Sequence, residues 1–254
     1  MRALSRRALA HLSVMAWRSH GVDNPSLVRA LEANGIVRAR RVRAAMLAVD
    51  RGRYVDDAEA YMDHPLPIGY NATISAPHMH ARCLELLETR ARAGARALDV
   101  GSGTGYLCAC LGELVLREAR TRDPTRGDES AEGLVVGVEH VPELVARSRE
   151  NVARDGKEAW LRSGRLILVC GDGREGYAAR APYDVIHVGA SAAEVPKALL
   201  DQLAIGGRMV IPVGDERGQE LFVIDRLEDG TYEKRADMGV IYVPLTSKES
   251  QLGR

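Results

Sequence analysis

The chain has 254 residues, enough for one large α/β domain with a substantial core. Lys and Arg together number 35, and so do Asp and Glu, so no overall charge draws the chain to nucleic acid or to a membrane surface. Four cysteines lie among apolar neighbours without a Cys-x-x-Cys pair, which predicts reduced thiols and neither a disulfide framework nor a zinc site. No stretch approaches the ~20 apolar residues of a membrane span.

The first 20 residues contain four arginines and no acidic residue. We interpret residues 1–14 as a disordered basic extension, of the kind that an upstream start codon produces, with Met15 as the other candidate start. The alternative is a mitochondrial transit peptide, because such peptides have a similar composition. We expect residues 15–254 to form a single domain and place the protein in the cytoplasm, with the mitochondrial alternative open.

Two helices are predicted ahead of any nucleotide-type motif. The first starts at Asn24 and Pro25, which suit a cap and a first turn, and is closed by Gly35. The second covers residues 42–49, where apolar side chains recur at helical spacing. Because the N-terminal part, residues 15–95, carries no nucleotide signal, we predict that it forms a helical cap on the substrate side.

Residues 61–81 combine a predicted loop with the start of a helix. Pro and Gly in residues 61–70 disfavour regular structure, and Pro77 is a plausible first residue of a helix that runs over residues 79–90. Ser75, just before it, is a residue type that ordinarily caps a helix or occupies a turn. His78 and His80 point in different directions from a helix and have no third ligand nearby, so we predict no metal site.

The rest of the chain is organised around residues 97–105. A short apolar strand containing Asp99 leads into a turn through Gly101, Gly103 and Gly105, and an apolar stretch that suits a helix follows. Glycines let the backbone pass close to a ligand, and a helix start offers unpaired N–H groups. The spacing matches neither the dinucleotide fingerprint nor the phosphate loop. It resembles motif I of class I S-adenosylmethionine-dependent methyltransferases; a turn that only packs helix on strand is the alternative.

Two acidic residues follow later predicted strands. The strand over residues 134–138 ends at Glu139, where a carboxylate can hydrogen-bond both hydroxyls of a ribose; an exposed strand-end acid is the alternative. Asp172 follows the strand over residues 166–170, where its carboxylate could contact the amine of an adenine; a plain turn is the alternative.

A charged insert separates the glycine turn from Glu139. It covers residues 117–133 and is predicted to be a solvated loop.

Strands and helices alternate through the rest of the chain. The remaining predicted elements are helices at 142–154 and 195–203, strands at 183–188 and 208–213, a hairpin from 221 to beyond 232, and a strand-rich tail at 238–246. This order predicts an α/β fold: a doubly wound, Rossmann-like sheet with helices on both faces, an N-terminal helical cap and a C-terminal β-hairpin with edge strands. Residues 96–254 would supply the cofactor-binding sheet.

From residue 15 to residue 251 the sequence resembles the protein-L-isoaspartate (D-aspartate) O-methyltransferase family of class I enzymes. The run A-T-I-S-A-P-H-M-H at 72–80 is the most specific part, because other class I methyltransferases lack it. The extension before Met15 and the insert depart from the family pattern and affect localisation and loop contacts rather than the chemistry. The matching stretches are 15–17, 72–81, 97–105, 171–174, 181–184 and 243–246.

The resemblance implies methyl transfer from S-adenosyl-L-methionine to the α-carboxylate of L-isoaspartyl and D-aspartyl residues in damaged peptides and proteins, with S-adenosyl-L-homocysteine as the product and no metal. It implies that Ser75 is the active-site residue, whose hydroxyl orients the isoaspartyl carboxylate. An extended substrate peptide could pair with an edge at residues 240–243. The residues that the resemblance places at the cofactor are Thr73, Ile74, His80, Asp99, Gly101, Ser102, Gly103, Gly105, Glu139, His140, Gly171, Asp172, Thr246 and Gln251.

Two other functions stay open at this stage. A class I methyltransferase acting on RNA or a small molecule would share the glycine turn and Glu139 but would not explain residues 72–81. A non-catalytic methyltransferase-like binding protein would not need to keep Ser75, Asp99 and Glu139. We expect a monomer that acts on isoaspartyl-containing proteins and has no nucleic-acid or membrane partner.

Overall fold

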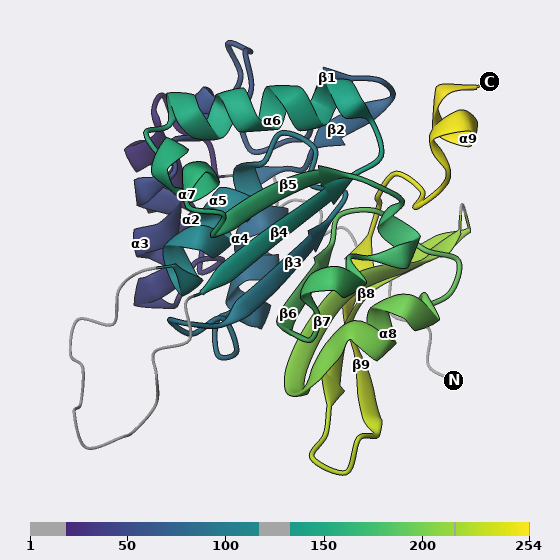
Figure 1. The fold of residues 1–254 in the computed structure, drawn as a ribbon. Helices are drawn as coiled ribbons and strands as arrows, with labels where there is room; N and C mark the ends of the chain where they lie inside the picture. The colour runs from purple at the N-terminus through teal and green to yellow at the C-terminus, as the bar shows by residue number, and fades with distance from the viewer. Residues whose placement is uncertain (1–18, 117–132, 216, 254) are drawn as a thin grey trace.

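The computed structural model describes residues 19–116, 133–215 and 217–253. Its centre is a seven-stranded sheet in the order β5-β4-β3-β6-β7-β8-β9, accompanied by a two-stranded sheet, β1-β2 (Figure 1). Neighbouring strands from β5 to β7 run parallel, and β8 and β9 are antiparallel. The strands are β1 (Leu66–Gly69), β2 (Ala72–Ile74), β3 (Arg96–Val100), β4 (Leu134–Glu139), β5 (Leu166–Cys170), β6 (Tyr183–Val188), β7 (Leu203–Asp215), β8 (Gly218–Arg226) and β9 (Tyr232–Val240).

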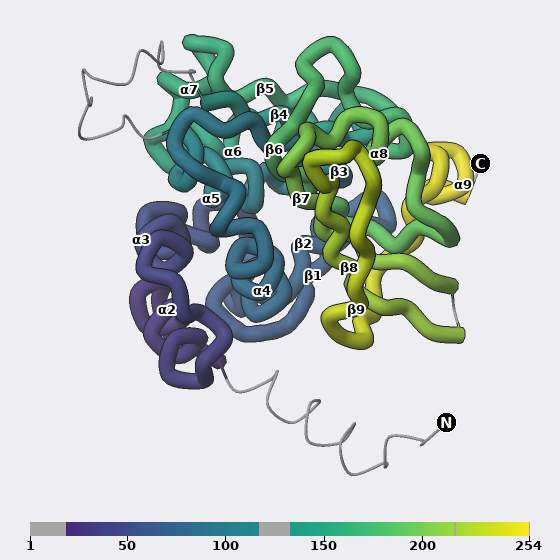
Figure 2. The backbone as a smooth tube through the Cα atoms, turned by 90° about the horizontal axis from the view of Figure 1, so that it is seen from below, coloured from purple at the N-terminus to yellow at the C-terminus, as the bar shows by residue number. Residues whose placement is uncertain are grey.

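Helices cover both faces of the sheet, but unequally. On one face α4, α5 and α6 pack on the strands. On the side away from β8 and β9, α3 packs against α4 and α5, and α2 packs against α3 (Figure 2). The other face is covered by α8 and two 3₁₀ turns, η2 (Gly173–Glu175) and η3 (Ala178–Arg180). The helices are α2 (Asn24–Ala33), α3 (Arg40–Ala48), η1 (Arg51–Arg53), α4 (Pro77–Leu87), α5 (Tyr106–Val115), α6 (Pro142–Arg154), α7 (Glu158–Arg162), α8 (Lys197–Gln202) and α9 (Lys248–Leu252).

The core consists of two apolar layers, one on each face of the sheet. Successive strand residues point to opposite faces, so each parallel strand feeds both layers. Val135, Val185 and Val210 belong to the layer under the larger helices. Val136 and Ile186 belong to the layer under α8. Because both faces are apolar, the predicted doubly wound α/β sheet is confirmed.

The boundaries of several predicted elements are confirmed, and one helix start is corrected. The strands at 166–170 and 183–188 and the helix at 142–154 begin and end as predicted. The first helix is capped by Asp23 rather than Asn24, because the Asp23 carboxylate accepts from Ser26 N at 2.8 Å. The Asn24 side chain instead donates to the carbonyl oxygen of Met46 at 2.9 Å, which ties α2 to α3.

Two other predictions were wrong. Part of the predicted loop at 61–70 forms β1, which pairs antiparallel with β2 because Gly69, Tyr70 and Asn71 adopt positive φ and make a tight turn. The predicted strand-rich tail ends at Val240. From residue 241 to residue 246 the chain makes only an isolated bridge, between Pro244 and Ser191, and then enters α9.

The predicted segment at 1–14 lies outside the described residues, and so does the predicted insert apart from Gly133. The division into a cap at 15–95 and a sheet at 96–254 stays a prediction. No helix among the residues that the structure describes is long and apolar enough to cross a lipid bilayer.

Candidate active site

The glycine turn lies at the carboxyl ends of the central parallel strands, where ligands bind in open α/β sheets. Gly101 N and Ser102 N both donate to the carbonyl oxygen of Val138, at 2.9 and 3.1 Å, and so attach the turn to β4. Gly189 N donates to the carbonyl oxygen of Val100 at 2.8 Å, so the residue after β6 is attached to the end of β3. Gly101, Gly103 and Gly105 all have positive φ, a conformation that side chains disfavour.

A narrow cleft of about 50 Å³ runs along this turn. It contains seven of the residues predicted to bind a cofactor: Thr73, Gly101, Gly103, Glu139, His140, Thr246 and Gln251. Its other lining residues, which the sequence did not single out as ligands, are Ala72, Val138, Gly173, Gly189, Ala190, Val243, Pro244 and Leu245.

Glycine backbone forms much of the cleft wall. A Cβ added at Gly173 would lie 2.6 Å from Val100 Cγ1, and one at Gly189 would lie 3.2 Å from the carbonyl oxygen of Gly101. Neither position therefore tolerates a side chain without movement. This glycine-lined cradle suits a ligand that lies directly against the backbone.

Glu139 lies at the end of β4, as predicted, and is buried. Its Oε2 accepts from Gly103 N and its Oε1 from Val141 N, both at 3.1 Å. The carboxylate therefore ties the glycine turn to the start of α6 while lining the cleft. A carboxylate held in this way can also accept hydrogen bonds from the hydroxyls of a ribose.

Gln251 closes the cleft from the C-terminal side. Its Oε1 lies 3.0 Å from His140 Nε2, and its carbonyl oxygen accepts from Asn71 Nδ2 at 2.8 Å. These contacts tie α9 to both β4 and the β1–β2 turn. The predicted C-terminal residues, Thr246 and Gln251, thus lie at the cleft beside the glycine turn, although they are far from it in the sequence.

Asp99 does not face the cleft. It is buried at the end of β3, and its two oxygens contact His187 Nδ1 at 2.7 Å and Cys108 Sγ at 3.1 Å. Burial lowers the pKa of His187, but its hydrogen bonds to Asp99 and Cys83 and their charges outweigh that effect and raise it to about 10. Asp99 and His187 therefore form an ion pair beneath the glycine turn.

Ser75 lies between β2 and α4 and is half-buried. It does not cap α4, because that helix starts after Ala76 without a side-chain cap. Its carbonyl oxygen accepts from Arg51 Nη2 at 2.9 Å, and its hydroxyl hydrogen-bonds the Tyr242 side chain. Ser75 is therefore held by Arg51 on one side and by Tyr242 on the other. It stands two residues after Thr73, which lines the cleft.

His80 and Ile74 are buried behind this segment. The His80 Nδ1 lies 3.4 Å from Arg51 Nη1, and its ring packs on Tyr106. Burial, followed by the nearby charges of Arg51 and His187, holds the pKa of His80 well below its usual range. His80 is therefore a neutral packing residue in this structure.

The remaining predicted residues support the cleft rather than line it. Ser102 is buried in the glycine turn, and Gly105 precedes the first residue of α5. Gly171 N donates to the carbonyl oxygen of Glu139 at 3.1 Å. The Asp172 carboxylate pairs with Arg174 at 2.6 Å, and this hydrogen bond lowers its pKa. The described residues contain no cluster of three or more His, Cys, Asp or Glu side chains placed to hold a metal ion.

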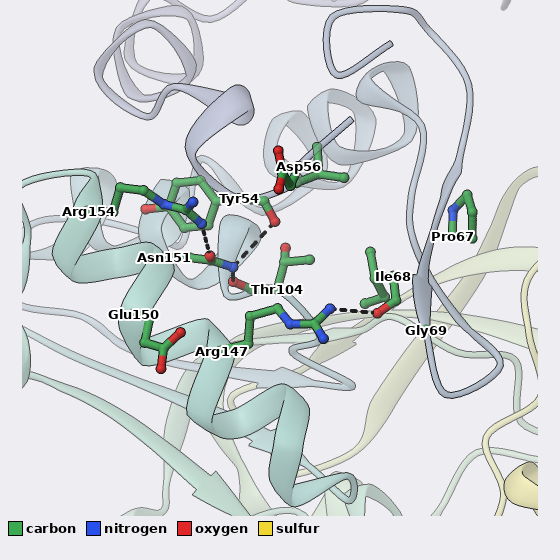
Figure 3. Close-up of a pocket in the computed structure, with 11 residues that line it drawn as sticks. Tyr54, Asp56, Pro67, Ile68, Gly69, Thr104, Arg147, Glu150, Asn151 and Arg154 are labelled. Carbon is green, nitrogen blue, oxygen red and sulfur yellow. Dashed lines mark hydrogen bonds between the residues drawn. The ribbon is translucent and has the colours of Figure 1, made fainter. Parts of the chain in front are cut away.

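A larger cavity of about 710 Å³ lies next to the cleft (Figure 3). It is lined by β1 and Thr104, whereas the cleft is lined by β2 and Gly103, so the hairpin and the glycine turn separate the two. Its Arg147 donates to the carbonyl oxygen of Ile68 at 2.9 Å. We place the candidate site in the smaller cleft because that is where the strand ends, the glycine turn and buried Glu139 converge.

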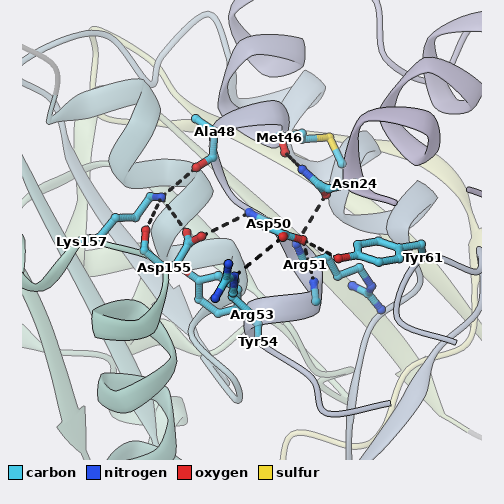
Figure 4. Close-up of polar contacts among 11 residues, drawn as sticks. Asn24, Met46, Ala48, Asp50, Arg51, Arg53, Tyr54, Tyr61, Asp155 and Lys157 are labelled. Carbon is cyan, nitrogen blue, oxygen red and sulfur yellow. Dashed lines mark hydrogen bonds and ion pairs between the residues drawn. The ribbon is translucent and has the colours of Figure 1, made fainter. Parts of the chain in front are cut away.

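A polar network attaches the N-terminal helices to the sheet domain (Figure 4). Asp155, just after α6, accepts from Tyr54 Oη at 3.0 Å, from Lys157 Nζ at 2.6 Å and from Asp50 N at 3.4 Å. Lys157 Nζ also donates to the carbonyl oxygen of Ala48 at 2.8 Å. This network fixes the turn that carries Arg51, and Arg51 in turn holds Ser75.

Sequence reasoning missed four residues around Ser75 and Asp99: Arg51, Cys83, His187 and Tyr242. His187 offered a signal, because an ionisable residue stands inside the apolar strand β6. Arg51 offered none, because an arginine in a charged segment is usually exposed.

Residues 22–250 match the family model described as protein-L-isoaspartate(D-aspartate) O-methyltransferase. The chain belongs to this family. It is 50% identical over 238 residues to protein-L-isoaspartate O-methyltransferase 1 of Arabidopsis thaliana, covering 93% of this chain and 97% of the relative. It is 47% identical over 241 residues to the Caenorhabditis elegans protein-L-isoaspartate O-methyltransferase, covering 94% of this chain and all of the relative.

The family's solved structures share this fold. A Plasmodium falciparum protein assigned as a protein-L-isoaspartate O-methyltransferase, solved with S-adenosyl-L-homocysteine, matches with a TM-score of 0.77 and 34% identity. The match covers 88% of this chain and 98% of that chain. The family resemblance and the Rossmann-like fold predicted from the sequence are thus confirmed.

Proposed function

We propose that the protein transfers a methyl group from S-adenosyl-L-methionine to the α-carboxylate of L-isoaspartyl and D-aspartyl residues in damaged proteins. The observation that carries the proposal is that Ser75 stands two residues after Thr73, a residue of the glycine-lined cleft, in a chain of this family. A likeness to a relative solved with S-adenosyl-L-homocysteine supports the cofactor.

The chemical groups that line the cleft suit this cofactor. S-adenosyl-L-methionine supplies an activated methyl group on a sulfonium. Glu139 would accept hydrogen bonds from the ribose hydroxyls, and the backbone at Gly101 and Gly103 would lie along the ligand. Thr73, His140, Thr246 and Gln251 would complete the walls, while Asp99, Ser102 and Gly105 hold the turn in shape.

The chemistry requires little acid–base help from the protein. A carboxylate with a pKa near ~4 is already ionised at neutral pH and is the nucleophile. The protein's task is to align the carboxylate oxygen with the methyl group and to exclude water. We assign alignment to the Ser75 hydroxyl, as a hydrogen-bond donor to the carboxylate, and not as a nucleophile. The methyl ester then loses methanol as the adjacent backbone nitrogen closes a succinimide, whose hydrolysis partly restores aspartate.

The substrate peptide is proposed to lie extended, but with a smaller free edge than the sequence predicted. Tyr242 N and Tyr242 O are already bonded to the Gln219 side chain, at 2.7 and 3.1 Å. The carbonyl oxygen of Val243 accepts from Ser191 N at 2.8 Å. A peptide could therefore pair with β9 only up to Val240, and it would meet the exposed side chain of Ile241.

The test uses two synthetic peptides that differ only in an isoaspartyl or an aspartyl residue at one position, with labelled S-adenosyl-L-methionine. We expect base-labile label on the isoaspartyl peptide alone. Transfer to neither peptide, with cofactor binding retained, would overturn the proposal in favour of an RNA or small-molecule acceptor or a non-catalytic role. A monomeric state, the absence of nucleic-acid and membrane partners, and a cytoplasmic location, with mitochondria as the alternative, belong to the same proposal.

A further inference from the structure

A chain of buried polar side chains connects Asp99 to Ser75. Asp99 Oδ1 lies 2.7 Å from His187 Nδ1, and the His187 ring also hydrogen-bonds Cys83. Cys83 Sγ lies 4.0 Å from Tyr242 Oη, and Tyr242 hydrogen-bonds the Ser75 hydroxyl. Five separate segments contribute to it: β3, β6, α4, the tail after β9 and the residue after β2.

The chain runs directly behind the cleft. A Cβ added at Gly189, which lines the cleft, would lie 3.5 Å from His187 Cε1. Asp99, Cys83 and His187 are all buried, so water does not compete for their hydrogen bonds. Within the chain, Ser75 and Tyr242 at the far end are half-buried.

The ion pair at the inner end determines the direction of the hydrogen bond between His187 and Cys83. Although burial lowers the pKa of His187, the hydrogen bonds to Asp99 and Cys83 raise it to about 10, so the ring is an imidazolium at neutral pH. An imidazolium carries donors on both nitrogens and no acceptor. Cys83 Sγ must therefore accept from it, while either atom can be the donor between Cys83 Sγ and Tyr242 Oη.

Tyr242 connects this buried part of the chain to Ser75. Its side chain hydrogen-bonds the Ser75 hydroxyl, so the position of that hydroxyl depends on residues behind the cleft. We propose that His187, Cys83 and Tyr242 are positioning residues that hold the Ser75 hydroxyl where it meets the carboxylate that receives the methyl group. This inference rests on the methyl transfer proposed above, and it adds residues for which the resemblance implied no role.

Cys83 offers the sharpest test because two substitutions separate hydrogen bonding from packing. Cys83→Ser keeps a group that can hydrogen-bond both His187 and Tyr242, whereas Cys83→Ala removes it. We expect Cys83→Ala to lower kcat by about threefold to tenfold, the effect of one lost hydrogen bond, and Cys83→Ser to recover most of the loss. The Kd for S-adenosyl-L-homocysteine, measured by calorimetry, should stay within about twofold. Cys110→Ala, at another buried thiol in α5 outside the chain, is the matched control and should leave kcat unchanged.

Tyr242 provides an independent test that does not depend on substitution of a buried thiol. Tyr242→Phe should lower kcat by a similar factor, and it should have no further effect in a Ser75→Ala background, because it acts through Ser75. Tyr183→Phe removes a buried hydroxyl that bonds the carbonyl oxygen of Tyr177, outside the chain, and is its control. This comparison of single and double variants tests the positioning role of Tyr242 even if the Cys83→Ala protein fails to fold.

The outcomes separate this inference from the proposed function. An active wild-type protein in which Cys83→Ser is no better than Cys83→Ala, or in which Tyr242→Phe and Ser75→Ala are additive, would overturn the positioning chain alone. A wild-type protein that transfers no methyl group to the isoaspartyl peptide would overturn the proposed function and the chain with it.

Discussion

Gln251 Nε2 donates a hydrogen bond to the carbonyl oxygen of Tyr70, 2.9 Å away at the turn of the β1–β2 hairpin. The two residues stand 181 positions apart, and their contact holds the C-terminal helix over the glycine-lined cleft. The same side chain contacts His140, so one glutamine connects the hairpin, β4 and α9.

Loss of this contact is expected to weaken cofactor binding. Gln251→Ala removes the hydrogen bonds to Tyr70 and His140, each worth about 1 kcal/mol, and should raise the Kd for S-adenosyl-L-homocysteine by about thirtyfold. Isothermal titration calorimetry measures the change. Ser250→Ala, at an exposed neighbour on α9, should leave the Kd as it is in the wild type, and an unaltered Kd in Gln251→Ala would contradict the closing role.

The Asp99–His187 pair predicts a specific loss of stability at alkaline pH. The pKa of His187 is about 10 in the folded protein, above the ~6.5 of an unfolded histidine. A raised folded-state pKa contributes stability that is complete below about pH 6.5 and is lost as the pH rises through about 10.

Urea unfolding of the wild type and of His187→Gln at pH 7 and pH 9.5 measures this loss. The difference in the free energy of unfolding between the two proteins should shrink at pH 9.5 by at least ~1 kcal/mol, because only the wild type loses the contribution of His187. Groups common to both proteins cancel in this comparison. A difference that does not vary with pH would show that His187 is not charged in the fold.

Asp155 is expected to be a stabilising junction between the N-terminal helices and the sheet domain. Asp155→Ala removes the acceptor for Tyr54 Oη and Lys157 Nζ and leaves the mostly buried Lys157 ammonium without its close carboxylate. We expect a loss of about 2 kcal/mol in the free energy of unfolding, from urea titration. Asp56→Ala, at an exposed carboxylate two residues after Tyr54, should change it by less than ~0.5 kcal/mol. Equal stabilities of the two variants would argue against the junction.

Arg51 should matter for both stability and transfer. It is fully buried and donates to the carbonyl oxygens of Ala60 and Ser75, each at 2.9 Å, and burial lowers its pKa to about 10. Arg51→Met keeps the apolar volume but leaves two buried carbonyls without donors, so we expect a loss of about 2 kcal/mol and a kcat reduced about tenfold. Arg53→Met, two residues away and exposed, is the control. A folded Arg51→Met protein with the wild-type kcat would show that the hydrogen bond from Arg51 to the Ser75 carbonyl oxygen is not needed for methyl transfer.

The sheet was predictable because its signals are local. The alternation of apolar strands and amphipathic helices predicts β3 to β7 and α5 and α6, and the acid at the end of β4 identifies Glu139 as a residue of the cleft. Motif spacing likewise predicts the glycine turn, since Gly101, Gly103 and Gly105 are required by the backbone conformation there.

The contacts around Ser75 were not predictable in the same way. Arg51, His187 and Tyr242 are brought together by tertiary packing, and nothing in their local sequence says which residue each one faces. Asp99 illustrates the limit: its place in the motif suggested a cofactor contact, whereas its carboxylate is engaged by His187 and Cys108 beneath the turn. The tail after Val240 is apolar like a strand, but the Gln219 side chain occupies the backbone groups of Tyr242.

The most direct test of the proposed site compares kcat/KM for the paired isoaspartyl and aspartyl peptides in the wild type and in Ser75→Ala. We predict that the wild type acts on the isoaspartyl peptide alone. Ser75→Ala should lower kcat/KM by about tenfold to a hundredfold, the range expected for one hydrogen bond to a charged carboxylate, without a change in the cofactor Kd. A Ser75→Ala protein with the wild-type kcat/KM would contradict the assignment of the carboxylate to Ser75.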